Sequence, residues 1–336
     1  MSKVRLESPY LLFLGDVQDR IMAKTAAGVA YWRPDICVGE VGLPDCTVTL
    51  GLPKVTPAQG VAFGARTLVV GVANAGGHIS ERWTGLLLEA LEAGLDIASG
   101  LHSRIADVPI LAEAALRRGR RIDDIRHPRQ AIPIGRGSPR SGQRLLTVGT
   151  DCAVGKMYAS LAIAREMTDR GVTARFRATG QTGIFITGEG VCVDAVVSDF
   201  ISGAVEALSP EMPADQWDVI EGQGSLFHPA YAGVTLGLIH GSQPDAIVVC
   251  HEAGRDRMHE FDDFATPSLE LAIARNLEAA RLTNPHVRCV GVSMNTSRLA
   301  AEDAQALMTA TSKTLGLPCV DPVRTGVAAI VDRLLG

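Results

Sequence analysis

The chain has 336 residues, of which 46% are hydrophobic and 21% charged, and its net charge is −5. Because single domains usually span about 100–200 residues, this length predicts two domains. The small negative charge argues against a nucleic-acid partner, and no apolar run is long enough to cross a membrane. The N-terminus lacks the apolar stretch of a signal peptide. We therefore expect a cytoplasmic protein that acts on small molecules, and homo-oligomerisation is the default for such a chain.

The seven cysteines are scattered and form no C-x-x-C pair. This pattern is typical of reduced thiols rather than of disulfides or a zinc site, so we predict no metal.

Short apolar runs alternate with amphipathic stretches in the first part of the chain, which indicates βαβ units and an α/β domain over residues 1–125. Strands are expected at 10–14, 36–38, 67–73 and 96–98, and helices at 18–31, 81–93 and 110–118. Polar residues at 15–16 and 74–78 follow two of the strands and could form a crevice. The sequence has no G-x-G-x-x-G fingerprint there, so dinucleotide binding has little support.

Residues 126–143 are rich in proline, glycine and arginine, as is typical of a linker. The alternation then resumes over residues 144–336, which predicts a second, parallel-sheet domain. Its strands are expected at 144–148, 173–178, 217–220, 246–251, 287–293 and 318–320, and its helices at 156–170, 268–281 and 302–315.

A glycine-rich turn joins the first strand of this second domain to its first helix. It consists of Gly149, Thr150, Asp151, Cys152, Ala153, Val154, Gly155, Lys156 and Met157. Backbone N–H groups of such a turn, the helix N-terminus and the lysine together suit an anion, so we predict a phosphate loop rather than a ligand-free turn. A packing role for Cys152 is favoured over a nucleophilic one.

The loop resembles that of the dethiobiotin-synthetase group, which carries Ser or Thr after the Gly-Lys pair. Here Met157 occupies that position, and a thioether cannot replace the hydroxyl that binds Mg²⁺. This departure argues against phosphoryl transfer.

Polar residues follow the later strands, where the carboxyl ends of a parallel sheet form the ligand crevice. We therefore predict substrate contacts from Gln181, Thr182, Asp199, Gln223, Gly224, Ser225 and Arg255. Asp199 precedes a helical stretch and is equally well explained as a helix cap. Asn295 is a candidate for hydrogen bonding to an adenine. Glu221 and His228 flank a glycine-rich turn and are the candidate proton carriers.

Five motifs together resemble the DgcN-like family, which is associated with N-acetylation of D-glutamate. They are Leu-Gly-Asp-Val near the N-terminus, the phosphate loop, Thr-Gly-Gln-Thr-Gly, Ser-Asp-Phe-Ile-Ser-Gly and Glu-Gly-Gln-Gly-Ser-Leu-Phe-His-Pro. The resemblance extends over nearly the whole chain. It implies a Rossmann-like N-terminal domain, a P-loop NTPase-like C-terminal domain and acetyl-CoA-dependent N-acetyltransferase activity on a D-amino acid, most simply D-glutamate.

Under that hypothesis, the loop around Lys156 would hold the phosphates of acetyl-CoA without Mg²⁺. Glu221 or His228 would be the base, backbone N–H groups of residues 222–225 would stabilise the oxyanion, and Arg255 would bind a substrate carboxylate. Two alternatives stay open. The chain could be an ATP-dependent ligase or kinase of the dethiobiotin-synthetase type, or a nucleotide-binding regulatory module without catalysis.

Overall fold

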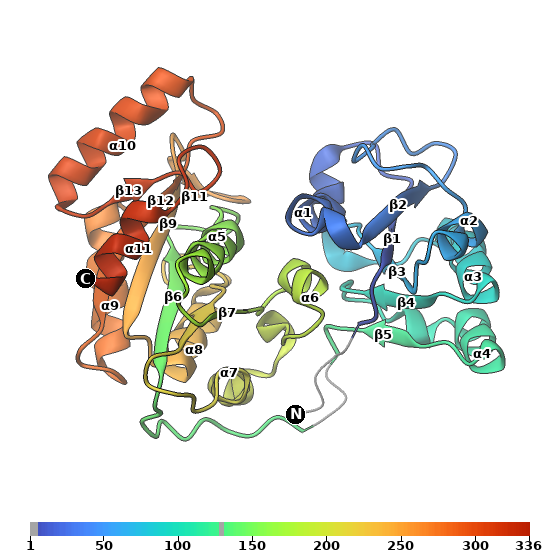
Figure 1. Ribbon diagram of the computed structural model, residues 1–336, viewed down its shortest axis with the longest axis horizontal. Coiled ribbons are helices and arrows are strands. Elements are labelled where there is room, and N and C mark those ends of the chain that lie inside the picture. Colours follow the sequence, from blue (N-terminus) through green and yellow to red (C-terminus); the bar gives the residue numbers. More distant parts are fainter. Residues whose placement is uncertain (1–5, 128–130) are drawn as a thin grey trace. The chain divides into compact units, whose positions relative to one another are not determined.

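The computed structural model describes residues 6–127 and 131–336. The chain forms two compact units (Figure 1), and the first comprises Met1–Ala131 together with Gly180–Ala195. The second comprises Ile132–Thr179 and Val196–Gly336. Each unit contains its own parallel sheet.

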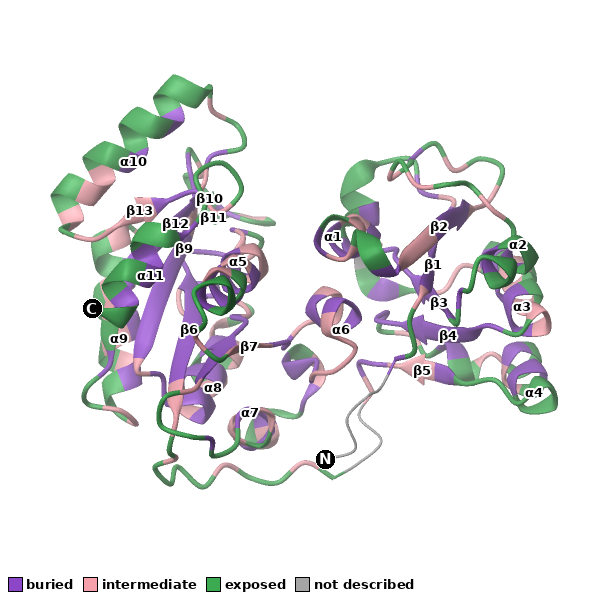
Figure 2. Cartoon of the chain, in the orientation of Figure 1, coloured by how far each residue is buried: buried purple, intermediate pink, exposed green. Residues whose placement is uncertain are grey.

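The N-terminal unit is built on a five-stranded sheet with the order β2-β1-β3-β4-β5. All neighbouring strands run parallel. Their bounds are β1 (Tyr10–Gly15), β2 (Cys37–Gly42), β3 (Thr67–Val70), β4 (Asp96–Ser99) and β5 (Ile122–Asp124). Strands β1, β3 and β4 are buried along their whole length (Figure 2), because helices cover the sheet. The strand order reverses between β1 and β3, which is the usual place for a ligand crevice.

The helices of this unit begin and end at recognisable signals. They are α1 (Lys24–Trp32), α2 (Pro57–Ala62), α3 (Thr84–Ala93), α4 (Pro109–Arg118) and α6 (Gln181–Thr187). A capping box of Thr56 and Gln59 starts α2. Glycines in the left-handed conformation end α3 and α4, at Gly94 and Gly119.

Helix α6 belongs to the N-terminal unit although it follows the second strand of the other unit. Its residues 184–186 are buried, and the helix packs against α1. The guanidinium of Arg33 donates a hydrogen bond of 3.1 Å to the carbonyl of Ile186. The buried Arg126 pairs with Asp194 and donates to the carbonyl of Gly100. These contacts attach residues 180–195 to the first sheet.

The C-terminal unit is built on a six-stranded parallel sheet with the order β13-β12-β9-β6-β8-β7. Its strands are β6 (Gln143–Gly149), β7 (Ala174–Arg177), β8 (Trp217–Ile220), β9 (Ala246–Glu252), β12 (Arg288–Asn295) and β13 (Cys319–Val320). The chain moves outward from β6 to β7, returns to β8 and then crosses to β9 on the other side of β6. The carboxyl end of β6 is therefore the topological switch point of this sheet.

Helices flank this second sheet, and a hairpin follows β9. The helices are α5 (Lys156–Asp169), α7 (Ile201–Leu208), α8 (Ala232–Ser242), α9 (Leu269–Arg281), α10 (Ala301–Leu315) and α11 (Ala328–Leu335), and the hairpin strands are β10 (Arg257–Met258) and β11 (Phe261–Ala265). The core contains Leu145, Val219 and Val248 from the sheet and Ile163 from α5. Helix α10 is mostly exposed (Figure 2).

Most of the predicted strands coincide with observed ones to within a few residues, and β8 coincides fully. The sequence analysis missed α2, α6, α8, α11, β5 and the β10–β11 hairpin. The linker predicted at residues 126–143 includes 128–130, which lie outside the described residues. The guanidinium of Arg140 in this stretch donates to the carbonyls of Ser209 and Gly241, both at 2.5 Å.

Across residues 6–127 and 131–336, no helix has the length and apolar character to cross a bilayer.

Candidate functional site

The glycine-rich turn lies at the switch point of the second sheet, between β6 and α5. Gly155 has a φ of +98° and directly precedes α5, and Ala153 also has a positive φ of +54°. These left-handed residues turn the loop back on itself. The side chain of Lys156 is buried, and its Nζ donates to the carbonyl of Asp151 at 2.8 Å. Burial lowers the pKa of Lys156.

The loop is held from within by the carboxylate of Asp151, which is fully buried. This carboxylate accepts the N–H of Cys152 at 2.6 Å and that of His259 at 2.7 Å. The Nη1 of Arg255 donates to it at 2.8 Å and to the carbonyl of Cys152 at 2.7 Å. The other terminal nitrogen of Arg255 pairs with Glu252. In this structure Arg255, predicted to bind substrate, therefore braces the loop.

Glu221 lies directly after β8 and is buried beside the end of β7. Its Oε2 accepts the N–H of Thr179 at 2.9 Å, and the hydroxyl of Thr179 donates to the carbonyl of Glu221 at 2.7 Å. The next residue, Gly222, donates its N–H to the hydroxyl of Thr147 at 3.0 Å. A Cβ on Gly222 would lie 1.8 Å from the carbonyl oxygen of Thr147. Glycine is thus required for the strands to approach at this point.

The turn that follows is tied down by its own polar groups. Gly224 has a φ of +67°, and the hydroxyl of Thr235 donates to the carbonyl of Gln223 at 2.7 Å. The buried hydroxyl of Ser225 accepts the N–H of Phe227 at 3.3 Å. The amide nitrogen of Gln223 reaches the hydroxyl of Thr179 at 3.4 Å. These bonds fix the turn, and His228 follows it after Leu226 and Phe227.

His228 is 1% exposed and is packed between two aromatic rings. It stacks on Tyr231 with ring centroids 4.6 Å apart and meets the ring of Phe261 edge-on at 4.9 Å. Its Nδ1 accepts the N–H of Ala230 at 3.2 Å. Its Nε2 is buried and has no hydrogen-bond partner among the residues that the structure describes.

Asp151, Cys152 and His228 come together at the start of the loop, with one ligand-type atom from each within 4.8 Å of the others. Such a trio could bind a metal ion, but its surroundings oppose one. Arg255 already pairs with Asp151, and the Lys156 ammonium adjoins it. Two positive charges repel a cation and favour an anionic or neutral ligand. Burial also raises the pKa of the Cys152 thiol, which keeps it protonated, whereas metals bind the thiolate.

The remaining predicted residues belong to several different elements. Gln181 and Thr182 start α6 in the N-terminal unit, where the hydroxyl of Thr182 lies 3.4 Å from that of Thr25. Asp199 is exposed, and α7 begins at Ile201 without a side-chain cap, so the capping role predicted as one possibility is wrong. Asn295 ends β12 and accepts the N–H of Ser297 at 3.1 Å. Met157 is partly buried in the first turn of α5.

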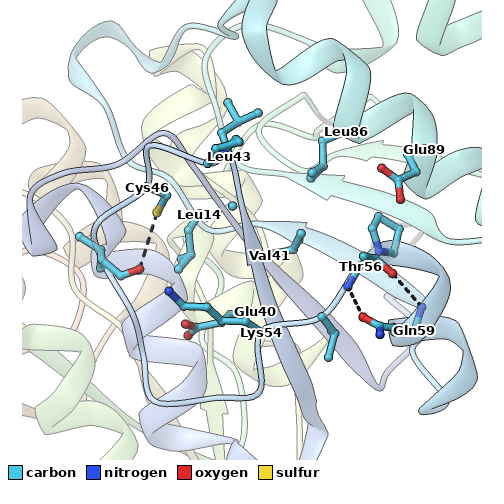
Figure 3. Close-up of a pocket in the computed structure, with 15 residues that line it drawn as sticks. Leu14, Glu40, Val41, Leu43, Cys46, Lys54, Thr56, Gln59, Leu86 and Glu89 are labelled. Carbon is cyan, nitrogen blue, oxygen red and sulfur yellow. Dashed lines mark hydrogen bonds between the residues drawn. The ribbon is translucent and has the colours of Figure 1, made fainter.

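The N-terminal unit has a hollow of about 440 Å³ beside the ends of β1 and β2 (Figure 3). Its walls are largely apolar, and its polar groups are mostly bonded within the protein. The carboxylate of Glu40 accepts the hydroxyl of Thr49 at 2.6 Å and the N–H of Leu50 at 2.7 Å. Figure 3 also shows the mutual hydrogen bonds of Thr56 and Gln59. The sequence analysis predicted none of these residues.

A second hollow of this unit, of about 430 Å³, is lined by His78, His102 and His127 from the turns after β3, β4 and β5. His78 belongs to the crevice residues that the strand pattern suggested. Partial desolvation of the His102 ring, followed by the charge of Arg126, lowers the pKa of His102, although the residue is exposed.

Comparisons with known proteins agree with this architecture. Residues 133–331 match the P-loop domain DUF1611_C, described as a domain of unknown function, and residues 43–128 match the Rossmann-like domain DUF1611_N. The chain belongs to the DUF1611 family. A solved DUF1611 family protein from Anabaena variabilis superposes with a TM-score of 0.89 at 31% identity, covering 98% of this chain and 99% of that one. The predicted Rossmann-like and P-loop α/β fold is thus confirmed.

Two curated relatives of this DUF1611 chain are named D-glutamate N-acetyltransferase. The protein from Tritonibacter scottomollicae is 50% identical over 329 residues, which cover 98% of this chain and 99% of the relative. The protein from a Pseudoalteromonas species is 47% identical over 331 residues, or 98% and 100% of the two chains. The resemblance inferred from the motifs is therefore confirmed.

Proposed function

We propose that this chain transfers an acetyl group to the amine of D-glutamate. The observation that carries the proposal is the near-half identity, over 98% of the chain, to two proteins named for that reaction. Because the match includes both units, the relatives share the phosphate-loop half and the Rossmann-like half with this chain.

Acetyl-CoA is the proposed acetyl donor. Coenzyme A carries phosphates, and the loop at residues 149–157 offers backbone N–H groups, the N-terminus of a 14-residue helix and the Lys156 ammonium. Met157 stands where a Mg²⁺-binding hydroxyl would be needed for phosphoryl transfer. The loop therefore suits phosphate binding without phosphate cleavage. Asn295 is the proposed contact for the adenine.

The chemistry requires a base for the substrate ammonium and a donor for the thioester oxygen. Glu221 and His228 are the proposed proton carriers, since both are buried beside the loop. The turn at Gln223, Gly224 and Ser225 is proposed to contact the substrate. Arg255 would bind a substrate carboxylate only by exchanging one of its present partners, Asp151 or Glu252.

The test is thiol release from acetyl-CoA, measured with D-glutamate, L-glutamate, D-aspartate or no acceptor, each with and without Mg·ATP. We expect release that requires D-glutamate and is independent of Mg·ATP. Consumption of Mg·ATP with an acid substrate would instead support a ligase of the dethiobiotin-synthetase type. Tight nucleotide binding with no turnover of either donor would support a regulatory module.

A cytoplasmic location and a homo-oligomeric state complete the proposal. None of the seven cysteines forms a disulfide, as suits a reducing compartment. Light scattering on the purified chain and fractionation of the cells that produce it would test the two points separately.

A further inference from the structure

The Nε2 atom of His228 is a buried polar atom that the protein itself does not satisfy. Leaving a buried donor without an acceptor costs about 1–3 kcal/mol, so buried polar groups without partners are rare in folded proteins. The neighbouring polar groups of this loop are bonded internally, as the contacts of Asp151 and Ser225 show. The Nε2 atom of His228 is therefore available to hydrogen-bond a ligand.

The other ring nitrogen decides what that atom can do. Nδ1 accepts the N–H of Ala230 at 3.2 Å, so it presents a lone pair and carries no proton. An imidazole with a bare Nδ1 carries its proton on Nε2. In this arrangement Nε2 can donate a hydrogen bond but cannot accept the proton of an ammonium group. The geometry therefore excludes His228 as the base, and Glu221 remains the candidate for that role.

The surroundings of the ring indicate which acceptor it meets. Tyr231 and Phe261 form apolar walls against it, and the carboxylate of Asp151 is close by. The two aromatic walls offer a doubly charged phosphate neither a hydrogen-bond donor nor a positive charge, so a phosphate is poorly suited to a position against them. A neutral acetyl group fits better, because its methyl can pack on the rings while its oxygen accepts one hydrogen bond.

Building on the proposed function, we propose that the Nε2–H of His228 donates to the carbonyl oxygen of the acetyl thioester. Glu221 takes a proton from the substrate ammonium, and the freed amine attacks the carbonyl carbon while the C=O electron pair moves to the oxygen that His228 holds. Collapse of this intermediate re-forms C=O, breaks the carbon–sulfur bond and releases coenzyme A as a thiolate that is then protonated. The nitrogen gives up its second proton, which protonates the thiolate, and Glu221 returns the first proton to solvent.

Three variants test this role through the position of the donor. The side-chain nitrogen of glutamine can reach the place of Nε2, whereas that of asparagine reaches only the place of Nδ1. We expect His228→Ala and His228→Asn to lower kcat by roughly 100-fold or more, with KM values changed only a few-fold, as for the loss of one oxyanion donor. His228→Gln should recover at least about ten-fold of that loss and keep the wild-type pH profile.

Two results would overturn the donor role. One is His228→Gln being as inactive as His228→Ala while its thermal unfolding matches the wild type. The other is loss of a limb of the pH profile in His228→Gln, which would show that His228 titrates as the base. If the wild type itself releases no thiol, the proposed function is wrong and the donor role is wrong too. If the wild type is active but the variants give one of the two results above, only the donor role is wrong, so the two failures are distinguishable.

A second measurement does not depend on activity. In protein labelled with ¹⁵N-histidine, two-bond ¹H–¹⁵N correlation should show the His228 ring with its proton on Nε2 and a bare Nδ1, with His228→Gln identifying the signal. A proton on Nδ1 near neutral pH would contradict the inference directly.

Discussion

The polar side chains at the carboxyl edges of the two sheets differ in their burial and hydrogen bonding. At the N-terminal sheet, His78 and His102 are exposed and line an open hollow. At the C-terminal sheet, Asp151, Glu221 and His228 are all buried, and each is hydrogen-bonded to backbone N–H groups. Buried polar groups must find partners, so the second edge is fixed in one geometry before any ligand arrives. Preorganisation of this kind is what catalysis requires, and the exposed His78 and His102 of the first edge are not fixed by burial in this way.

Glycine substitutions provide the largest contrast between the edges. A Cβ on Gly222 would meet the backbone carbonyl oxygen of Thr147 at 1.8 Å, whereas a Cβ on Gly100 would meet only side-chain atoms of Gln181, its Oε1 at 2.2 Å and its Cβ at 2.6 Å. Because the Oε1 of Gln181 can move aside while its Cβ can move only with the backbone, we expect Gly222→Ala to cost at least about 3 kcal/mol and Gly100→Ala about 2 kcal/mol. Hydrogen-exchange mass spectrometry would report each unit separately.

Gly233→Ala in α8 is the matched control, since its Cβ would meet nothing within 4 Å. It should leave stability unchanged or raise it slightly. Equal destabilisation by Gly100→Ala and Gly222→Ala would contradict the difference between the two edges.

Lys156 gives the next largest effect, because it is the buried cation of the loop. The proposed charge-assisted contact of Lys156 with a phosphate of the donor implies a roughly 100-fold lower kcat/KM in Lys156→Ala. Steady-state thiol release measures it, with Lys313→Ala on the exposed face of α10 as the control. Unchanged kcat/KM in Lys156→Ala would mean that the loop does not hold the donor.

The ion pair of Arg126 and Asp194 tests the N-terminal unit. Asp194→Asn would leave the buried guanidinium without its counter-charge and should cost about 2 kcal/mol, since Asp194 itself is partly exposed. Protection from hydrogen exchange should fall in residues 180–195 and in the first sheet, while β6 and α5 stay unchanged. The exposed Asp107→Asn is the control. Loss of protection in β6 would contradict the assignment of residues 180–195 to the first unit.

The smallest effect expected is a pH dependence of coenzyme A affinity. Burial lowers the pKa of Lys156, so its ammonium loses its proton at a pH below the usual lysine pKa of about 10.4. Affinity should fall as the pH rises through that lowered pKa, and Lys156→Arg should flatten the fall because arginine stays charged. The free energy of unfolding of the free protein should rise as the pH increases between the lowered pKa and the usual lysine pKa, since the unfolded chain keeps this proton to a higher pH. Calorimetry between neutral and alkaline pH would follow the first effect and urea unfolding the second.

The sequence predicted features that depend on neighbouring residues and missed those that depend on distant ones. The phosphate loop was predictable because strand, glycines, lysine and helix are consecutive. The location of α6 was not, because its seven residues include Gly183 and two threonines and only its packing on α1 selects the unit it joins. The mostly exposed hairpin strand β11 has no apolar alternation to reveal it.

The site shows the same limit. Glu221 and His228 could be selected as polar residues after a strand, but which nitrogen of His228 carries the proton depends on the N–H of Ala230. The role of Arg255 depends on Asp151, about a hundred residues away along the chain, which no local pattern reveals.

The path of the backbone between the two units also limits how this protein can be rearranged. The chain passes from one unit to the other three times, after Ala131, Thr179 and Ala195. A gene split at the first crossing would place residues 180–195 in the C-terminal fragment, where Ile184, Phe185 and Ile186 lack the surface of the first unit that covers them. We therefore expect that neither half can be exchanged as a separate cassette without residues 180–195 losing the unit they pack in.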